Sequence, residues 1–208
     1  IATELDDENR NNLVVPPGAW GDWINGGGWL VINGYHVDLI LRDIKRVEQI
    51  IKDTEQGIVT ANYQTGHPHG YISAMYRGEL AISRVQYSND ENFYELKKQA
   101  ETYPSALQKG LFDFFMFEAG FSLIFAKENI DKDDISYVCG HCFRSISGLN
   151  QVLFAMNKEY CINEKKAVKM IEGFKIKPSD YKERVDKVIS LISTNVDCTR
   201  KGIEILQR

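Results

Sequence analysis

The sequence has no uninterrupted apolar stretch of the length that crosses a bilayer, which takes about 20 residues in a helix. The nearest approach is 111–125, and Asp113 and Glu118 interrupt it. We therefore expect no membrane-spanning helix and no membrane partner. A signal peptide is not predicted either, because residues 3–8 are acidic where such a peptide is basic and then apolar. The expected location is the cytoplasm.

The sequence also lacks a cluster of basic residues. It has 25 Lys and Arg against 29 Asp and Glu among 208 residues, a formal net charge of −4. Surfaces that bind nucleic acid are typically basic, because they neutralise backbone phosphates. Nucleic acid is therefore not expected as a partner.

The four cysteines do not form the pattern of a disulfide framework, which agrees with a reducing compartment. Cys139, His141 and Cys142 match a dithiol redox motif in letters. Such a thiol is activated at a helix N-terminus that follows a strand, whereas this motif lies inside a long helical pattern. A zinc site would need further ligands. Ordinary helix thiols are therefore favoured over a redox or zinc role.

Two apolar runs that flank Asn33-Gly34 predict a β-hairpin over 29–41, because both residues of a two-residue turn need positive φ. In the second strand His36, Asp38 and Ile40 share one face. A carboxylate among apolar neighbours costs free energy unless it is paired or binds a metal ion. Asp38 is therefore either a functional residue or an edge-strand residue that faces water, and spacing alone favours neither.

The remaining periodicities predict mixed structure first and helices afterwards. The predicted elements are a helix over 43–56, strands over 58–63 and 79–87 with a short helix between them, and then helices over 90–102, 104–129, 131 or 133 to 158, 164–174, 178–193 and 196–206. The predicted fold class is α+β. Residues 1–88 form a partial α/β domain and residues 89–208 a helical bundle. Six phenylalanines are expected in the bundle core: Phe112, Phe114, Phe115, Phe117, Phe121 and Phe125.

Four segments carry a resemblance to a known family. They are Gly34-Tyr-His-Val-Asp-Leu-Ile-Leu41 with the helix after it, Gly66-His-Pro-His-Gly70, Leu153-Phe-Ala-Met-Asn-Lys-Glu-Tyr160 and Asn163-Glu-Lys165. Together they resemble the minimal nucleotidyltransferases of the DNA polymerase β superfamily, over about residues 13–190. The similarity is greatest to the branch with a C-terminal helical bundle, which includes aminoglycoside and lincosamide adenylyltransferases.

The resemblance implies an adenylyltransferase activity that depends on two Mg²⁺ ions. Such an enzyme moves a nucleoside monophosphate from ATP or another NTP to a hydroxyl of a small molecule, such as an aminoglycoside-like antibiotic. In the family three carboxylates surround the two metal ions, and Asp38 matches the third of them. The implied roles of Asp38 are metal ligand and general base for the acceptor hydroxyl. The implied location is a cleft between the α/β part and the bundle.

The sequence departs from the family at the other two carboxylates. Neither a Gly-Ser turn nor the Asp-x-Asp that follows it is present. We expect that these residues lie upstream of Ile1, and that the chain as given is inactive alone, since one carboxylate is a weak Mg²⁺ site. An open sheet edge is then expected to be covered by a neighbouring chain, by residues 1–24 or by an upstream segment.

Three histidines are further candidates for substrate contacts. His36 shares the face of Asp38, and it either tunes that carboxylate or is an unrelated surface residue. His67 and His69 lie in a loop that the resemblance places near the nucleotide, where His69 donates to a phosphate. The alternative is a turn with exposed imidazoles, because two histidines need additional ligands to hold a metal ion.

Tyr160, Asn163 and Lys165 lie where the chain turns between predicted helices. The resemblance implies that one of them meets the acceptor or the triphosphate, with Lys165 supplying positive charge. The competing interpretation is that Asn163 caps a helix and that the lysine is solvated.

A function of another class also agrees with the sequence. The chain is then a binding or regulatory module, such as a toxin–antitoxin partner that acts through its helical bundle. Ribonuclease activity of the HEPN type is disfavoured, because residues 149–151, where a histidine should follow Arg144, are Leu, Asn and Gln. A homodimer is compatible with either function.

Overall fold

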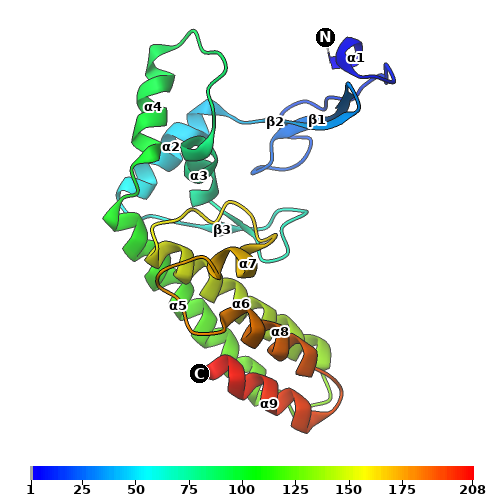
Figure 1. The fold of residues 1–208 in the computed structure, drawn as a ribbon, viewed down its shortest axis with the longest axis vertical. Helices are drawn as coiled ribbons and strands as arrows, with labels where there is room; N and C mark the ends of the chain where they lie inside the picture. The colour runs from blue at the N-terminus through cyan, green and yellow to red at the C-terminus, as the bar shows by residue number, and fades with distance from the viewer. Residues whose placement is uncertain (1) are drawn as a thin grey trace.

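The computed structural model describes residues 2–208 as an elongated molecule with a β-hairpin at one end and long helices at the other (Figure 1). In chain order the elements are α1 (Ala2–Leu5), β1 (Gly26–Ile32), β2 (Tyr35–Leu41), α2 (Ile44–Glu55), β3 (Ala61–Asn62), β4 (Tyr71–Ile72), α3 (Ala74–Ile82), α4 (Glu91–Glu101), α5 (Ser105–Glu128), α6 (Ile135–Met156), α7 (Ala167–Ile171), α8 (Tyr181–Leu191) and α9 (Val196–Gln207). The α+β class is confirmed. No helix of residues 2–208 has the length and apolarity that crossing a bilayer requires.

The predicted hairpin is confirmed. Strands β1 and β2 pair antiparallel, with Trp29 opposite Asp38. The turn residues Asn33 and Gly34 have φ of 50° and 77°, which is the left-handed backbone that a tight two-residue turn requires. Within residues 2–208 this sheet has two strands only.

The segment before the hairpin lies along the outer edge of β1. The Asp7 amide donates to the Val31 carbonyl at 2.7 Å, and the Val31 amide donates to the Asp6 carboxylate at 2.9 Å. Val15 and Gly27 exchange two further backbone hydrogen bonds. The Asp7 carboxylate also accepts from both turn amides. Residues 6–15 therefore cover one edge of the sheet.

Helix α2 agrees with the predicted helix over 43–56. Its N-cap is Asp43, whose carboxylate accepts from the Lys45 amide at 3.0 Å. Val47, Ile50 and Ile51 form its buried apolar face. The helical spacing of the apolar residues and the capping residue Asp43 therefore both predict this helix correctly.

The predicted strand over 79–87 is wrong, because its first residues belong to helix α3. Leu80 is buried on the same side as Tyr76 one turn earlier, whereas Ile82 is 63% exposed. The apolar residues at 80–82 are thus the last turn of a helix that starts at Ala74. The predicted strand over 58–63 is reduced to the two residues of β3, which pairs with β4.

The long predicted helices after residue 90 are present as α4, α5, α6, α8 and α9. Helices α5 and α6 pack against each other along their length, and α8 and α9 form a second pair (Figure 1). The exception is the predicted helix over 164–174, of which only α7, with five residues, is helical. Lys166 precedes it with φ of 64°, so the chain turns sharply where the prediction continued the helix.

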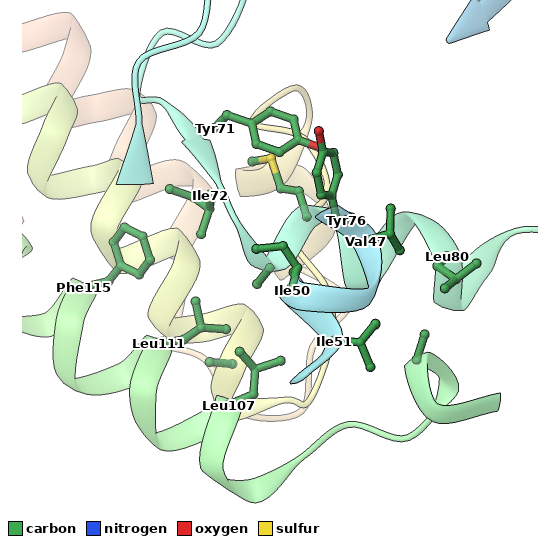
Figure 2. Close-up of a cluster of buried hydrophobic side chains, with 14 of the residues drawn as sticks. Val47, Ile50, Ile51, Tyr71, Ile72, Tyr76, Leu80, Leu107, Leu111 and Phe115 are labelled. Carbon is green, nitrogen blue, oxygen red and sulfur yellow. The ribbon is translucent and has the colours of Figure 1, made fainter. Parts of the chain in front are cut away.

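The largest hydrophobic cluster crosses the boundary predicted at residues 88 and 89. It combines side chains of α2, β4 and α3 with side chains of α5 and α6 (Figure 2). Ile51, Ile72, Leu107 and Phe115 are each at most 1% exposed. The first part of the chain and the helices therefore share one core, and the helices after residue 90 depend on apolar contacts from upstream.

The expectation that six phenylalanines fill the bundle core is wrong for most of them. Phe115 is completely buried, but Phe114, Phe117 and Phe121 are 41%, 70% and 49% exposed. The reason is that α5 packs mainly on α6. A helix that packs on one partner buries one side only, so the phenylalanines on its other sides remain at the surface.

Truncation of two of these phenylalanines tests the packing of α5. Phe115→Ala should lower the free energy of unfolding by about 3–5 kcal/mol, because it opens a cavity in the shared core. Phe117→Ala should change it by less than about 0.5 kcal/mol, since its ring already contacts water. Urea titration followed by circular dichroism measures both, and equal losses would contradict the observed packing.

Candidate functional site

The loop between β3 and β4, residues 63–70 (the histidine loop), is held against the helical part by one carboxylate. Glu164 precedes α7, and its Oε2 lies 2.9 Å from His67 Nδ1. Its Oε1 accepts from the backbone amides of His69 at 3.1 Å and Gly70 at 3.4 Å. Two segments that are more than 90 residues apart in sequence are therefore joined at this point.

A second carboxylate holds the other histidine of the same loop. His69 is almost completely buried, and its Nε2 lies 3.3 Å from Oε2 of Glu118 on α5. The imidazole also packs against the Phe115 ring, with 5.7 Å between centroids. Glu118 forms an ion pair with Arg144 of α6. His69, Glu118 and Arg144 thus contact one another in sequence from the loop to the two longest helices, although the contact of His69 with Glu118 lacks hydrogen-bond geometry.

These contacts change the acidity of both glutamates. Burial raises the pKa of Glu164, but the hydrogen bonds and charge of His67 outweigh burial and hold that pKa below its usual range. For Glu118 burial again acts upward, and His69 with Arg144 brings the pKa below its usual range. Both groups are therefore carboxylates at neutral pH.

Asn163 and Lys165 lie on either side of Glu164, so both are next to the histidine loop. The Asn163 side chain accepts from the Lys165 amide at 2.8 Å, which closes a local turn. The expectation that Asn163 caps a helix over 164–174 is wrong, because the helix begins only at Ala167. Lys165 is exposed and its ammonium group faces solvent.

Tyr160 belongs to a different environment. Its hydroxyl accepts from Nε of Arg77 at 3.1 Å and donates to the Ala100 carbonyl at 2.9 Å. Burial raises the pKa of Tyr160. Arg77 has no exposed surface. Tyr160 therefore satisfies a buried guanidinium, and its hydroxyl is occupied by structural contacts.

Asp38 and His36 lie on β2, and the structure does not bring them to the histidine loop. All residues from Tyr35 to Ile40 are exposed, and the hairpin lies apart from helices α5 to α9 (Figure 1). The expectation that Asp38 lies in a cleft against the bundle is therefore not met in residues 2–208. The reason is local: the hairpin continues into α2 through Arg42, whose guanidinium binds Glu79 of α3 at 2.7 Å, and its outer face has no covering layer.

A groove of about 800 Å³ runs along α5 and α6. Phe114, Phe117, Phe121 and Phe125 line one wall, and Glu118, His141 and Arg144 supply its polar groups. Burial and the charge of Arg144 lower the pKa of His141. The groove is apolar, and one of its carboxylates is the one that contacts His69.

The cysteine motif shows no metal site. Cys139 is exposed, whereas Cys142 is buried and its pKa is raised to about 12 by burial. Across residues 2–208 no group of three His, Cys, Asp or Glu side chains is placed to hold a metal ion. His67 and His69 contact different carboxylates, so they do not converge on a common ligand.

Two of the residues that organise the loop, Glu118 and Glu164, were not among the predicted site residues. Glu118 left a signal in the sequence, because it interrupts the apolar pattern of 111–125. A charged side chain in such a pattern needs a partner when it is buried. Glu164 left no comparable signal, since it lies between polar residues in a segment that was predicted to be helical.

Comparison with known proteins gives no further assignment: no protein family, no curated protein and no solved structure matches this chain.

The two glutamates predict how stability depends on pH. Because their pKa values are lower in the folded chain than in the unfolded chain, their stabilising contribution is complete above the unfolded values and is lost as pH falls through the folded values. We expect the free energy of unfolding to fall between about pH 5 and pH 3.

Chemical denaturation at a series of pH values measures this dependence. The double variant Glu118→Gln with Glu164→Gln should show a flatter decline, because it lacks both ionisations. Glu159→Gln, which changes an exposed glutamate of the same region, is the control and should keep the slope of the unchanged protein. An unaltered slope in the double variant would contradict the assigned contacts.

Proposed function

We propose that the chain belongs to a nucleotidyltransferase, which transfers a nucleoside monophosphate from ATP or another NTP to a hydroxyl of a small molecule. The observation that supports this most is the contact of Glu164 with His67, His69 and Gly70. The resemblance implies that the histidine loop lies near the nucleotide and that one of Tyr160, Asn163 and Lys165 meets the acceptor or the triphosphate. The contact brings these two segments together, as the proposed function expects.

In this proposal the histidines position the nucleotide-binding segments and do not contact phosphate themselves. The His69 ring is 2% exposed, and its Nε2 faces Glu118. The His67 ring is 9% exposed, and its Nδ1 faces Glu164. Both rings are therefore largely shielded from a phosphate in solvent. Lys165, which is exposed next to Glu164, is the residue that we assign to the triphosphate.

Asp38 is proposed as the residue that accepts the proton of the acceptor hydroxyl, with His36 on the same strand face beside it. The Mg²⁺ ions that the family uses do not fit the described residues. A magnesium site needs several oxygen ligands in octahedral geometry, and residues 2–208 contain no group of three His, Cys, Asp or Glu side chains that could hold a metal ion. We propose that the metal ligands other than Asp38 come from a further segment.

The alternative function, a non-catalytic module that acts through its helices, has one observation in its favour. Three phenylalanines of the α5–α6 groove expose 41% or more of their surface, and exposed apolar patches often mark interaction sites. Release of pyrophosphate from ATP separates the two functions.

The first test is pyrophosphate release from ATP with Mg²⁺ and a panel of aminoglycosides. The 208-residue chain alone should release none. The same chain joined to a segment with a Gly-Ser turn and an Asp-x-Asp should release it. Robust release by the chain alone would contradict the assigned need for further carboxylates, and no release by the joined chain with any acceptor would favour the non-catalytic function.

A substitution at Asp38 tests the proposed base in that joined chain. Asp38→Asn keeps the shape of the side chain but cannot accept the proton, so turnover should fall by about 10²–10⁴-fold, with a smaller change in nucleotide affinity. Asp186→Asn, which changes an exposed aspartate of α8, serves as the control. Normal turnover in Asp38→Asn would remove Asp38 from the mechanism.

A further inference from the structure

One edge of the hairpin is covered by another segment of the chain, and the other edge is free. The outer edge of β1 is covered by residues 6–15, through the contacts of Asp6 and Asp7 with Val31 and the pairing of Val15 with Gly27. No element of residues 2–208 pairs with the outer edge of β2. An exposed strand edge is a template for another strand, and proteins normally cover it, shorten it or interrupt it.

The hydrogen-bond pattern identifies the open backbone groups. In an antiparallel pair, residues alternate between pointing their N–H and C=O groups at the partner strand and away from it. Gly27 and Val31 point theirs away from β2, because they bind Val15, Asp6 and Asp7. Their cross-strand partners are Ile40 and His36, and Asp38 lies midway between these. The N–H and C=O groups of His36, Asp38 and Ile40 therefore point outward from the free edge.

The side chains of β2 are equally uncovered. Tyr35, Val37 and Leu39 share one face and are 75%, 38% and 38% exposed. His36, Asp38 and Ile40 occupy the other face, and all three are exposed. A two-stranded hairpin with apolar residues at its surface is marginally stable in water. A third and a fourth strand beside β2 would extend both faces.

We propose that two copies of this chain pair through the free edges of β2, antiparallel and centred on Val37, to form one four-stranded sheet. In this register His36 lies opposite the partner's Asp38, and Asp38 lies opposite the partner's His36. The outward N–H and C=O groups of these residues then meet as hydrogen-bonded pairs. On the other face Tyr35 lies opposite the partner's Leu39, which covers apolar surface in both copies.

Charge complementarity selects this register among those that the backbone permits. Outward-pointing groups must face outward-pointing groups, so the centre of symmetry falls on a residue and not between two residues. A centre at Asp38 would place two carboxylates directly opposite each other, which is destabilising. A centre at Leu39 would place Asp38 opposite Ile40. Only the centre at Val37 pairs each imidazole with a carboxylate.

The dimer does not depend on the nucleotidyl transfer proposed above. Pairing uses the backbone edge of β2 and the contact of His36 with the partner's Asp38, and it needs neither nucleotide nor acceptor. The dimer is measured in the absence of nucleotide and metal ion. Its failure and the failure of the proposed function are therefore separate results.

The experiment is sedimentation velocity of the 208-residue chain at concentrations between about 1 µM and 1 mM. We expect a concentration-dependent dimer. His36→Asp places carboxylates opposite each other twice per dimer and should weaken dimerisation about ten-fold or more. The double variant His36→Asp with Asp38→His exchanges the imidazole and the carboxylate, so each again lies opposite the other. It should restore the dissociation constant of the unchanged chain.

A proline at the same edge is the matched control. Ile40→Pro removes an outward N–H that the register centred on Val37 does not use, and proline is tolerated on a strand where its nitrogen faces solvent. It should leave the dissociation constant within about three-fold of that of the unchanged chain. Trp20 and Trp29 stack on each other, so tryptophan fluorescence reports whether the hairpin is retained. A monomer at every concentration, a dimer indifferent to His36→Asp, or no rescue by the double variant would each overturn the proposal.

Discussion

The arrangement of the described chain depends on one buried guanidinium. Arg77 of α3 has no exposed surface, and its nitrogens donate to the Ile51 carbonyl and Thr54 hydroxyl of α2, to the Thr102 carbonyl after α4 and to the Tyr160 hydroxyl. Burying a charge is costly unless every donor finds an acceptor. These acceptors come from segments far apart in the sequence, so the cost is offset only when α2, α3, α4 and the segment after α6 are assembled together. The contacts of Arg77 therefore fix the position of helix α3 without any contribution from the candidate site residues.

The candidate site follows from that position. Strand β4 leads directly into α3, so the histidine loop before β4 has little freedom and falls against α5 and the segment before α7. Glu118 and Glu164 then complete the contact, each next to one histidine ring. The hairpin is different, because it reaches the core mainly through Arg42 and Glu79 and keeps β2 exposed. The histidine loop is thus attached to the shared core around α3. The hairpin, which contains Asp38 and His36, has a free edge at β2 that can pair with a further strand.

Local sequence patterns predict the hairpin and the long helices. Asn33-Gly34 predicts the hairpin because both residues tolerate positive φ, and the apolar spacing of α2, α5 and α6 predicts their extents. The errors are at places where tertiary contacts decide. Leu80 and Ile82 were interpreted as strand residues, although Arg77 and its acceptors hold this segment as a helix. Phe117 and Phe121 were placed in a core, although periodicity cannot show how many partners a helix has. The pairing of Glu164 with His67 joins residues 97 positions apart, and no local pattern contains such a contact.

The most direct test of this account is the free energy of unfolding of Arg77→Met, measured by urea titration with amide exchange as a second readout. Methionine fills most of the space but leaves the acceptor carbonyls buried without a donor, so a loss of about 3–5 kcal/mol is predicted, together with faster exchange in α2, α4 and the histidine loop. Glu55→Gln removes only the half-exposed partner of the same guanidinium and should cost less than about 1 kcal/mol. A loss below about 1 kcal/mol in Arg77→Met, or an exchange change confined to α3, would contradict the claim that this residue organises the fold.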